Sequence, residues 1–254
     1  MSTNLRPLGL LGSILFTAIP GLLCIGTIRY GVPWAMGAGI SQLVAFHIAL
    51  YAPCALLGLT AVLSYRWEGN PMQWTAFRER MRLGSMSRRL WLITGAVTLL
   101  VLILEDLLSP GQLILAELPL FAPPDWLAAP FNPLEPFELP LSHFMGTELA
   151  GQYWIPVAYV PCLLANILGE ELLWRGYLLP RQELAFGKWA WLVNGLCWIL
   201  LFHMFLPWIF MTIIPSMVLV PWLAQRQKST VSAIVIHGTG NTLLLVLLIA
   251  GVLQ

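Results

Sequence analysis

Charged residues are scarce in this sequence. Lys, Arg, Asp and Glu together make up 10% of its 254 residues, whereas hydrophobic residues make up 58%. A typical soluble domain carries about 25% charged residues. No single water-soluble core could bury so much apolar surface, so the scarcity of charge excludes an ordinary soluble domain and indicates a protein surrounded by lipid.

Two further absences narrow the possible functions. The net charge is only +1 and no basic stripe runs along the chain, so nothing indicates a nucleic-acid partner. No two cysteines form a CxxC pair, and all four lie in apolar segments: Cys24, Cys54, Cys162 and Cys197. We therefore expect small buried thiols rather than disulfides or a zinc–thiolate site.

Long apolar runs are abundant. A membrane-spanning helix needs about 20 apolar residues, because each residue rises about 1.5 Å and the hydrocarbon is roughly 30 Å thick. We count seven runs, at residues 8–28, 39–65, 90–108, 153–180, 189–206, 208–224 and 231–252. The predicted fold is all-α, a polytopic membrane bundle of about seven transmembrane helices. The first run is long enough to span and lacks a small-residue cleavage pattern, so we expect a retained helix.

Basic residues predict the orientation of the bundle. Residues 66–89 contain six arginines, whereas residues 109–152 contain no Lys or Arg and five acidic residues. Because Lys and Arg favour cytoplasmic loops, we predict a cytoplasmic N-terminus. Twelve of the 13 basic residues then lie on the cytoplasmic side, and only Arg29 does not.

The chain divides into two parts. We assign residues 1–149 to N-terminal transmembrane helices with the basic cytoplasmic loop, and residues 150–254 to the functional core. The outer segment, residues 109–152, contains eight prolines, which exclude a long helix. Its aromatic and aliphatic residues predict a loop packed on the outer membrane surface, serving either as a structural cap or as a gate for substrate.

Three charged residues stand inside the fourth apolar run: Glu170, Glu171 and Arg175. An ionisable residue at the centre of a membrane helix costs at least ~2.5 kcal/mol, so it usually lines a cavity or pathway. Glu171 and Arg175 are four residues apart and can neutralise each other. Glu170 points about 100° away, toward Asn166 and Trp174. We therefore predict one structural carboxylate, Glu171, and one that is free for chemistry, Glu170.

Two later runs add polar side chains at overlapping depths. His203 lies in the fifth run, and His237 and Asn241 lie one turn apart in the last. A carboxylate and an imidazole can activate water, while a second imidazole and an amide can donate to an oxyanion. Two histidines with a glutamate could also ligate zinc, although HExxH is absent. We expect the Glu105–Asp106 pair to lie at the outer interface instead.

Each of these groups also has an ordinary structural explanation. A buried Glu–Arg pair can lock two helices together, and a membrane histidine can donate a hydrogen bond between helices. No serine-triad elbow or aspartyl dyad accompanies them. The presence of all three polar segments in one chain favours a site for peptide hydrolysis.

The motifs resemble those of a known family. Their order is Glu170-Glu171-Leu-Leu-Trp-Arg175 followed by Gly176, then His203, then His237-Gly-Thr-Gly-Asn241. This pattern is similar to EExxxR, FxxxH and HxxxN of the CPBP (CAAX protease and bacteriocin-processing, or ABI) intramembrane endopeptidases, which include type II CAAX prenyl endopeptidases. Ile199 replaces the phenylalanine of the second motif. The resemblance covers about residues 150–245.

The resemblance implies a helical fold with a conical cavity open to the cytoplasm and to lipid. It implies that Glu170 and His203 activate water, that His237 and Asn241 form the oxyanion site, and that Glu171 and Arg175 brace the cavity. Members are described as glutamic proteases or as metalloproteases. A metal-dependent mechanism would place zinc on Glu170, His203 and His237.

The predicted function is an intramembrane endopeptidase of a bacterial-type inner membrane. Its expected partners are the lipid bilayer and a membrane-anchored protein or peptide cut near the cytoplasmic face. The family serves bacteriocin processing or self-immunity, peptide-signal processing and protein sorting, and no residue selects among them. The alternative is a non-catalytic immunity or scaffold protein that retains the motifs for helix packing. A transporter has less support, because no inverted repeat is present.

Overall fold

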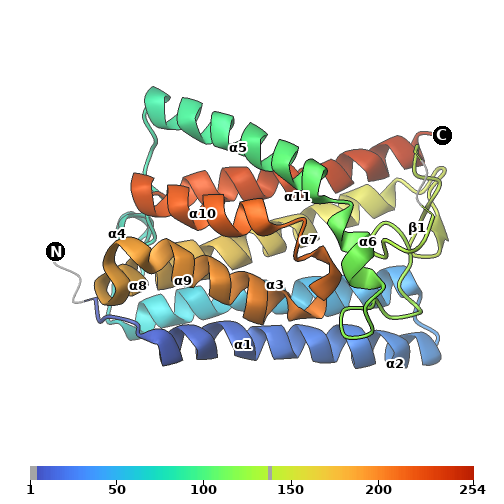
Figure 1. Cartoon of the computed structure of the whole chain (residues 1–254), viewed down its shortest axis with the longest axis horizontal. Helices are drawn as coiled ribbons and strands as arrows, with labels where there is room; N and C mark the ends of the chain where they lie inside the picture. The colour runs from blue at the N-terminus through green and yellow to red at the C-terminus, as the bar shows by residue number, and fades with distance from the viewer. Residues whose placement is uncertain (1–4, 137–138) are drawn as a thin grey trace.

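The computed structural model of the protein describes residues 5–136 and 139–254. Its helices lie side by side along the long axis of the molecule (Figure 1). The strands of the described part, β1 (His143–Phe144) and β2 (Thr147–Glu148), form one short antiparallel hairpin. The predicted all-α class is confirmed.

The first half of the chain begins with a long composite helix. Helix α1 (Leu10–Gly26) continues through a π-helical turn, η1 (Thr27–Gly31), into α2 (Val32–Gly37). The predicted end at residue 28 was wrong. The helix continues past Arg29, whose guanidinium donates a 3.3 Å hydrogen bond to the carbonyl of Ala122. Four more helices follow: α3 (Gln42–Trp67), α4 (Trp74–Arg80), α5 (Arg88–Leu108) and α6 (Gly111–Ala116).

The second half contains two helical hairpins interrupted by irregular turns. Its elements are α7 (Trp154–Glu171), π-helical η2 (Leu172–Leu178), α8 (Leu179–Phe186), η3 (Gly187–Trp189), α9 (Ala190–Cys197), π-helical η4 (Trp198–Phe202), 3-10 turns η5 (His203–Phe205) and η6 (Pro207–Ile209), α10 (Ile214–Gln227) and α11 (Thr230–Val252).

The predicted end of the fourth run at Pro180 was also wrong. Pro180 lies in the first turn of α8, after the π-helical segment, and a proline is tolerated there because the first turn leaves N–H groups without helical partners. The chain reverses instead at Gly187, whose φ of +56° suits a residue without a side chain. Helix α9 then packs back against α8.

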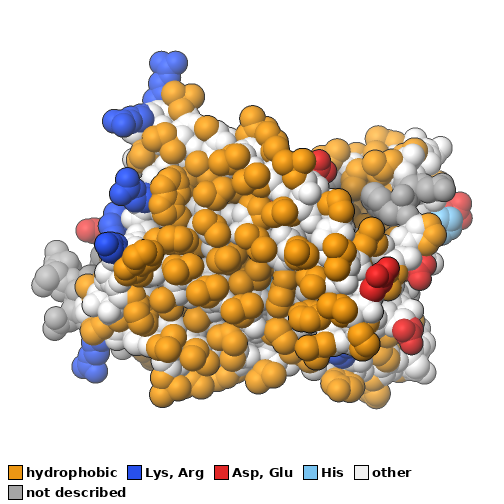
Figure 2. Space-filling model, viewed as in Figure 1, with side chains coloured by type: hydrophobic (Ala, Val, Ile, Leu, Met, Phe, Trp, Pro, Cys, Tyr) orange, Lys and Arg blue, Asp and Glu red, His pale blue; other side chains and the backbone are white. Residues whose placement is uncertain are grey.

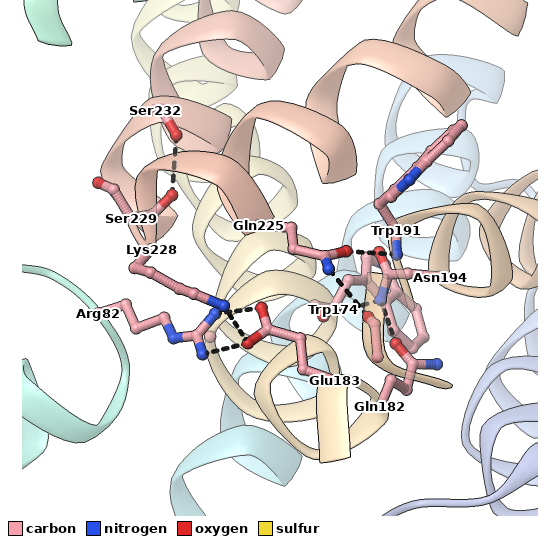
Figure 3. Close-up of polar contacts among 12 residues, drawn as sticks. Arg82, Trp174, Gln182, Glu183, Trp191, Asn194, Gln225, Lys228, Ser229 and Ser232 are labelled. Atoms are coloured by element: carbon pink, nitrogen blue, oxygen red, sulfur yellow. Dashed lines mark hydrogen bonds and ion pairs between the residues drawn. The ribbon is translucent and has the colours of Figure 1, made fainter. Parts of the chain in front are cut away.

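A buried polar network holds this hairpin to the rest of the bundle. The Asn194 amide donates to the Trp174 carbonyl at 3.0 Å and to Gln182 Oε1 at 2.8 Å (Figure 3). Gln182 in turn donates to Ser13 Oγ in α1 at 3.0 Å. Buried polar groups are stable only when they have partners, so this chain of bonds fixes one arrangement of α1, α8 and α9.

Five helical stretches of the described residues are long and apolar enough to cross a membrane: Leu10–Gly37, Gln42–Trp67, Arg88–Leu108, Trp154–Phe205 and Thr230–Val252. The fourth has 52 residues and contains the reversal at Gly187. Helix α10 has 14 residues, fewer than the roughly 20 that a perpendicular span needs. The chain is therefore an integral membrane protein with five candidate spans among its described residues, and the count of seven stays a prediction.

Charges separate to the two ends of the apolar bundle. In Figure 2, Lys and Arg gather at the end with the N-terminus, whereas Asp and Glu gather mainly at the opposite end. A wide hydrophobic surface lies between them, as expected for contact with lipid acyl chains. This pattern supports the predicted cytoplasmic N-terminus through the preference of Lys and Arg for the cytoplasmic side.

Cysteine labelling in intact cells tests this orientation. Thr75 and Asp125 are exposed at opposite ends of the bundle, so each can be replaced by cysteine with little effect on packing. We expect a membrane-impermeant maleimide to label Asp125→Cys and to leave Thr75→Cys unlabelled until the cells are opened. The unsubstituted protein provides the background. Labelling of residue 75 alone would show that the bundle is inverted.

The two halves of the chain meet where α3 crosses α7. A Cβ atom on Gly169 would lie 2.0 Å from the Cys54 carbonyl oxygen, and one on Gly58 would lie 3.3 Å from the Gly169 backbone. Only glycine permits this approach, which is typical of small residues at membrane helix interfaces. Because Glu170 follows Gly169 directly, the crossing also fixes the position of this carboxylate.

The proline-rich segment covers one end of the bundle, as predicted (Figure 1). Its residues Leu127 and Phe144 are buried in the main hydrophobic core. Besides the bond from Arg29 to Ala122, several hydrogen bonds attach it to the helices: for example, Gln42 donates to the Trp126 carbonyl at 2.5 Å, and the Trp208 indole donates to the Phe131 carbonyl at 3.0 Å. These contacts support the structural-cap interpretation, and the gating role stays a prediction.

Candidate active site

A buried ion-paired cluster lies at the junction of α7 and η2. Glu171 and Arg175 are each at most 1% exposed. Glu171 Oε1 lies 3.0 Å from Arg175 Nη1, which confirms the predicted contact. The same oxygen lies 2.9 Å from His237 Nδ1 on α11, a contact that sequence reasoning did not predict. Glu171 therefore joins α7 to α11 as well as neutralising Arg175.

Glu170 faces a different set of neighbours, as its helical position predicted. Asn166 Nδ2 donates to Glu170 Oε1 at 2.7 Å, and Trp198 Nε1 donates to Glu170 Oε2 at 2.8 Å. The predicted proximity to Asn166 is confirmed. Trp174, the other expected neighbour, has its ring centroid 5.3 Å from that of Phe202, and its proximity to Glu170 stays a prediction.

Trp198 is the residue that sequence reasoning missed. Besides donating to Glu170, its ring lies 4.2 Å from the His203 ring and 5.0 Å from the Arg175 guanidinium carbon. Its carbonyl oxygen lies 3.2 Å from His203 Nδ1. Trp198 begins the π-helical segment η4, and such segments occur often at functional sites. With 12 tryptophans in the chain, nothing in the sequence singles this one out.

Ile199 is buried beside this tryptophan in the hydrophobic core, with 4% of its surface exposed. The resemblance placed a phenylalanine at this position. An isoleucine can fill the same apolar space without contributing a reactive group. The departure from the motif is therefore a packing change.

Replacing Trp198 by phenylalanine separates its hydrogen bond from its ring. We expect Trp198→Phe to lower the free energy of unfolding by about 1.5–3 kcal/mol, because Glu170 loses a donor within the protein interior. Trp189→Phe, at a ring that is 56% exposed, should change it little. Thermal unfolding of the purified variants measures both. Equal stability of the two variants would show that the indole N–H contributes nothing.

A cavity of about 510 Å³ adjoins these side chains. Glu170, His203, His237 and Asn241 all line it, although they come from α7, η5 and α11. Glu105 and Asp106 of α5 line it too. The predicted position of this pair at the outer interface stays a prediction. Helix α5 packs against α11, and this contact brings the last turn of α5 to the cavity.

The cavity extends from the middle of the bundle toward the acidic end. Its lining includes Ser109 and Gln112 after α5, and Pro130 and Phe131 of the proline-rich segment. In the orientation predicted from the arginines, this is the outer end. The resemblance implied a cavity open to the cytoplasm, so the two expectations disagree for this chain. The labelling experiment at residues 75 and 125 decides which side the cavity faces.

The hydrogen bonds assign protons within the site. His203 Nδ1 faces a carbonyl oxygen, which can only accept, so Nδ1 carries the proton. His237 Nδ1 faces the Glu171 carboxylate and is protonated for the same reason. Asn241 Nδ2 donates one hydrogen to the His237 carbonyl at 3.1 Å and keeps its second hydrogen for another acceptor.

A metal-dependent mechanism would use the same side chains. Among residues 5–136 and 139–254, no three His, Cys, Asp or Glu side chains come together as a metal-binding group. Both Glu170 oxygens accept hydrogen bonds, from Asn166 and Trp198. These oxygens keep further lone pairs, so zinc on Glu170, His203 and His237 stays a prediction, and we assign no step of the reaction to a metal.

Residues 152–243 match the family described as Type II CAAX prenyl endopeptidase Rce1-like. This segment belongs to that family. The matched range contains every motif residue, from Glu170 to Asn241. No curated protein and no solved structure matches the chain.

Because the matched family is described as an endopeptidase, the match to residues 152–243 indicates a protease-type domain whose substrate would be a protein or peptide. The match lies in the second half of the chain, and its first residues follow the proline-rich segment. Helices α1, α3 and α5 are outside it, yet α3 and α5 pack directly on its helices and contribute side chains to the cavity. The role of bacteriocin processing or self-immunity stays a prediction.

Proposed function

We propose that this protein is an intramembrane endopeptidase that hydrolyses a peptide bond of a membrane-associated protein or peptide. One observation carries the proposal. Four side chains of the family motifs, Glu170, His203, His237 and Asn241, line a single cavity inside an apolar bundle. Ionisable residues at membrane depth are costly and are kept where they serve a function.

Glu170 is the proposed general base. Asn166 and Trp198 each donate one hydrogen bond to its carboxylate, and these bonds fix its direction in the cavity. A carboxylate has about four lone-pair positions, so it can still accept a proton from a water molecule. It would then transfer this proton to the leaving amine as the peptide bond breaks.

His203 is the proposed partner of Glu170 in holding the water. Because Nδ1 donates to the Trp198 carbonyl, the neutral ring presents a lone pair at Nε2. This lone pair can accept a hydrogen bond from the attacking water. The Trp198 ring, 4.2 Å from the imidazole, limits the rotation of His203.

His237 and Asn241 are the proposed donors to the oxyanion. They lie four residues apart on α11 and face the same cavity. With Nδ1 bonded to Glu171, a protonated His237 can donate through Nε2, and Asn241 can donate its second amide hydrogen. Donors fixed in advance stabilise the negative charge that forms on the carbonyl oxygen.

Glu171 and Arg175 complete the charge balance. With His237 protonated, the positive charges of Arg175 and His237 equal the negative charges of Glu170 and Glu171. A buried group of charges is tolerated when it is paired and hydrogen-bonded. Glu171 and Arg175 thus act as positioning residues, since they hold His237 without lining the cavity.

The charge of the cavity limits which side chains the substrate can carry around the cleaved bond. Glu105 and Asp106 add two carboxylates, whereas the described residues that line the cavity include no Lys or Arg. A segment with neutral or basic side chains around the cleaved bond fits this environment better than an acidic one, because like charges repel at low dielectric constant.

Comparison of membranes with and without the protein tests the proposal. Cells that produce the protein should contain shortened forms of at least one membrane-associated protein or peptide, detected by mass spectrometry of new chain ends. Identical chain ends in the two membranes, when the protein is folded and abundant, would contradict an endopeptidase.

Asn241→Ala tests the oxyanion site. We expect turnover to fall by ~10²–10³-fold while substrate binding changes little, because the amide acts mainly as charge develops. Thr242→Ala is the matched control, since Thr242 follows on the same helix and its hydroxyl bonds only to the Gly238 carbonyl. Steady-state cleavage of an identified substrate measures both. A rise in KM alone would assign Asn241 to substrate binding.

The non-catalytic alternative has support from one observation. The contacts from Glu171 to Arg175 and His237 join α7 to α11 and would stabilise the bundle in any function. An immunity or scaffold protein needs these contacts but does not need a reactive Glu170. A Glu170→Gln variant that is folded and keeps full biological effect would favour this alternative.

A further inference from the structure

A second pocket lies at the basic end of the bundle, and none of the motif residues lines it. It has a volume of about 480 Å³, and three basic and three aromatic side chains line it: Lys188, Arg226, Lys228, Trp189, Trp191 and Trp222. We propose that this pocket binds the headgroup of an anionic phospholipid. The proposal is independent of peptide hydrolysis.

Tertiary contacts build the pocket from two separate parts of the chain. The turn η3 and the start of α9 form one wall, and the end of α10 forms the other. Gln225 joins them, because its Oε1 accepts from the Trp191 backbone N–H at 2.7 Å and its Nε2 donates to the Gly187 carbonyl at 3.0 Å (Figure 3). A side chain bonded at both ends holds the two walls at a fixed separation.

The pocket carries an excess of positive charge. Among the described residues, no Asp or Glu lines it. Glu183 lies beside it, but this one carboxylate already pairs with Arg82 at 2.7 Å and with Lys228 at 2.5 Å (Figure 3). Lys188 and Arg226 are both exposed, and Lys188 lies 5.4 Å above the Trp189 ring. A phosphate group would balance these charges.

The position of the pocket favours a lipid over a soluble anion. It lies at the end of α10, just before α11 begins, and the ends of helices in a membrane bundle are where the headgroup region is expected. Tryptophan is enriched at this interface because its ring is apolar and its N–H is polar. Basic pockets between transmembrane helices on the cytoplasmic side recognise anionic headgroups. A volume of 480 Å³ also exceeds the space that one inorganic phosphate fills.

Lipid binding by the purified full-length protein tests the proposal. Native mass spectrometry should show about one retained phosphatidylglycerol per chain, and little retained phosphatidylcholine. The variant Lys188→Gln/Arg226→Gln should bind phosphatidylglycerol about 25-fold more weakly, because each cation near an anionic surface contributes about fivefold. The control Arg88→Gln/Arg89→Gln removes the same charge from exposed positions outside the pocket and should bind like the unsubstituted protein.

Three results would overturn the proposal. Equal loss of affinity in both double variants would show general attraction to basic residues without a site. Equal retention of phosphatidylcholine would show apolar contact only. Displacement of the lipid by millimolar inorganic phosphate would show a site for the free anion. Thermal unfolding in phosphatidylcholine checks that the variants are folded. If the double variant is not folded, the single variant Arg226→Gln replaces it in the binding measurement.

Discussion

Glu170→Gln should abolish peptide cleavage while leaving the helical bundle intact. The change removes the proposed base but keeps the size of the side chain, and the amide oxygen can keep one of the two hydrogen bonds that Asn166 and Trp198 donate to separate carboxylate oxygens. General acid–base catalysis contributes ~10²–10⁴-fold to a rate, so we expect a loss of at least this size. The measurement is the rate of appearance of a new chain end from an identified membrane substrate.

Glu105→Gln is the matched control for this prediction. Glu105 lines the same cavity, so the two variants lose the same charge from the same space. Only Glu170 receives hydrogen bonds from both Asn166 and Trp198 and belongs to the family motif. Comparable rates for Glu170→Gln and the unsubstituted protein would refute the proposed mechanism. Equal loss in both variants would assign the effect to cavity charge.

Glu171→Gln should damage the fold rather than the chemistry. It removes the carboxylate that pairs with Arg175 at 3.0 Å and with His237 at 2.9 Å, both within the bundle. An uncompensated buried charge then remains on Arg175, and breaking such a pair costs ~3–5 kcal/mol. We expect low abundance in membranes and a large drop in the thermal unfolding temperature. Glu79→Gln, at an exposed carboxylate of α4, should behave like the unsubstituted protein.

A double variant distinguishes the loss of the Glu171–Arg175 ion pair from a change in side-chain shape. In Glu171→Gln/Arg175→Met both charges are gone, and an apolar side chain replaces the guanidinium. Because buried ion pairs can be replaced by packed apolar residues at little cost, much of the stability should return. Activity should stay low, since His237 has lost the carboxylate that holds it. If the double variant is no more stable than Glu171→Gln, the unpaired charge is not the cause of the damage.

Composition and charge placement alone predicted much of the molecule. Long apolar runs require helices in lipid, because each backbone polar group needs a partner inside its own segment. The i,i+4 spacing predicted the Glu171–Arg175 ion pair and the separate direction of Glu170, and the structure confirms both. The order of the three motifs predicted the family to which residues 152–243 belong. These conclusions depend on local geometry and on chemical type, which a sequence states directly.

Tertiary structure alone decided which distant side chains meet. Helical periodicity cannot foresee the π-helical turn that directs Trp198 toward Glu170, or the packing of α5 on α11 that brings Glu105 into the cavity. It also cannot foresee that Glu171 reaches His237, 66 residues later. The sequence alone identified the charged residues that lie inside apolar runs. Their partners depend on how helices cross, and that is fixed by packing between segments far apart in the sequence.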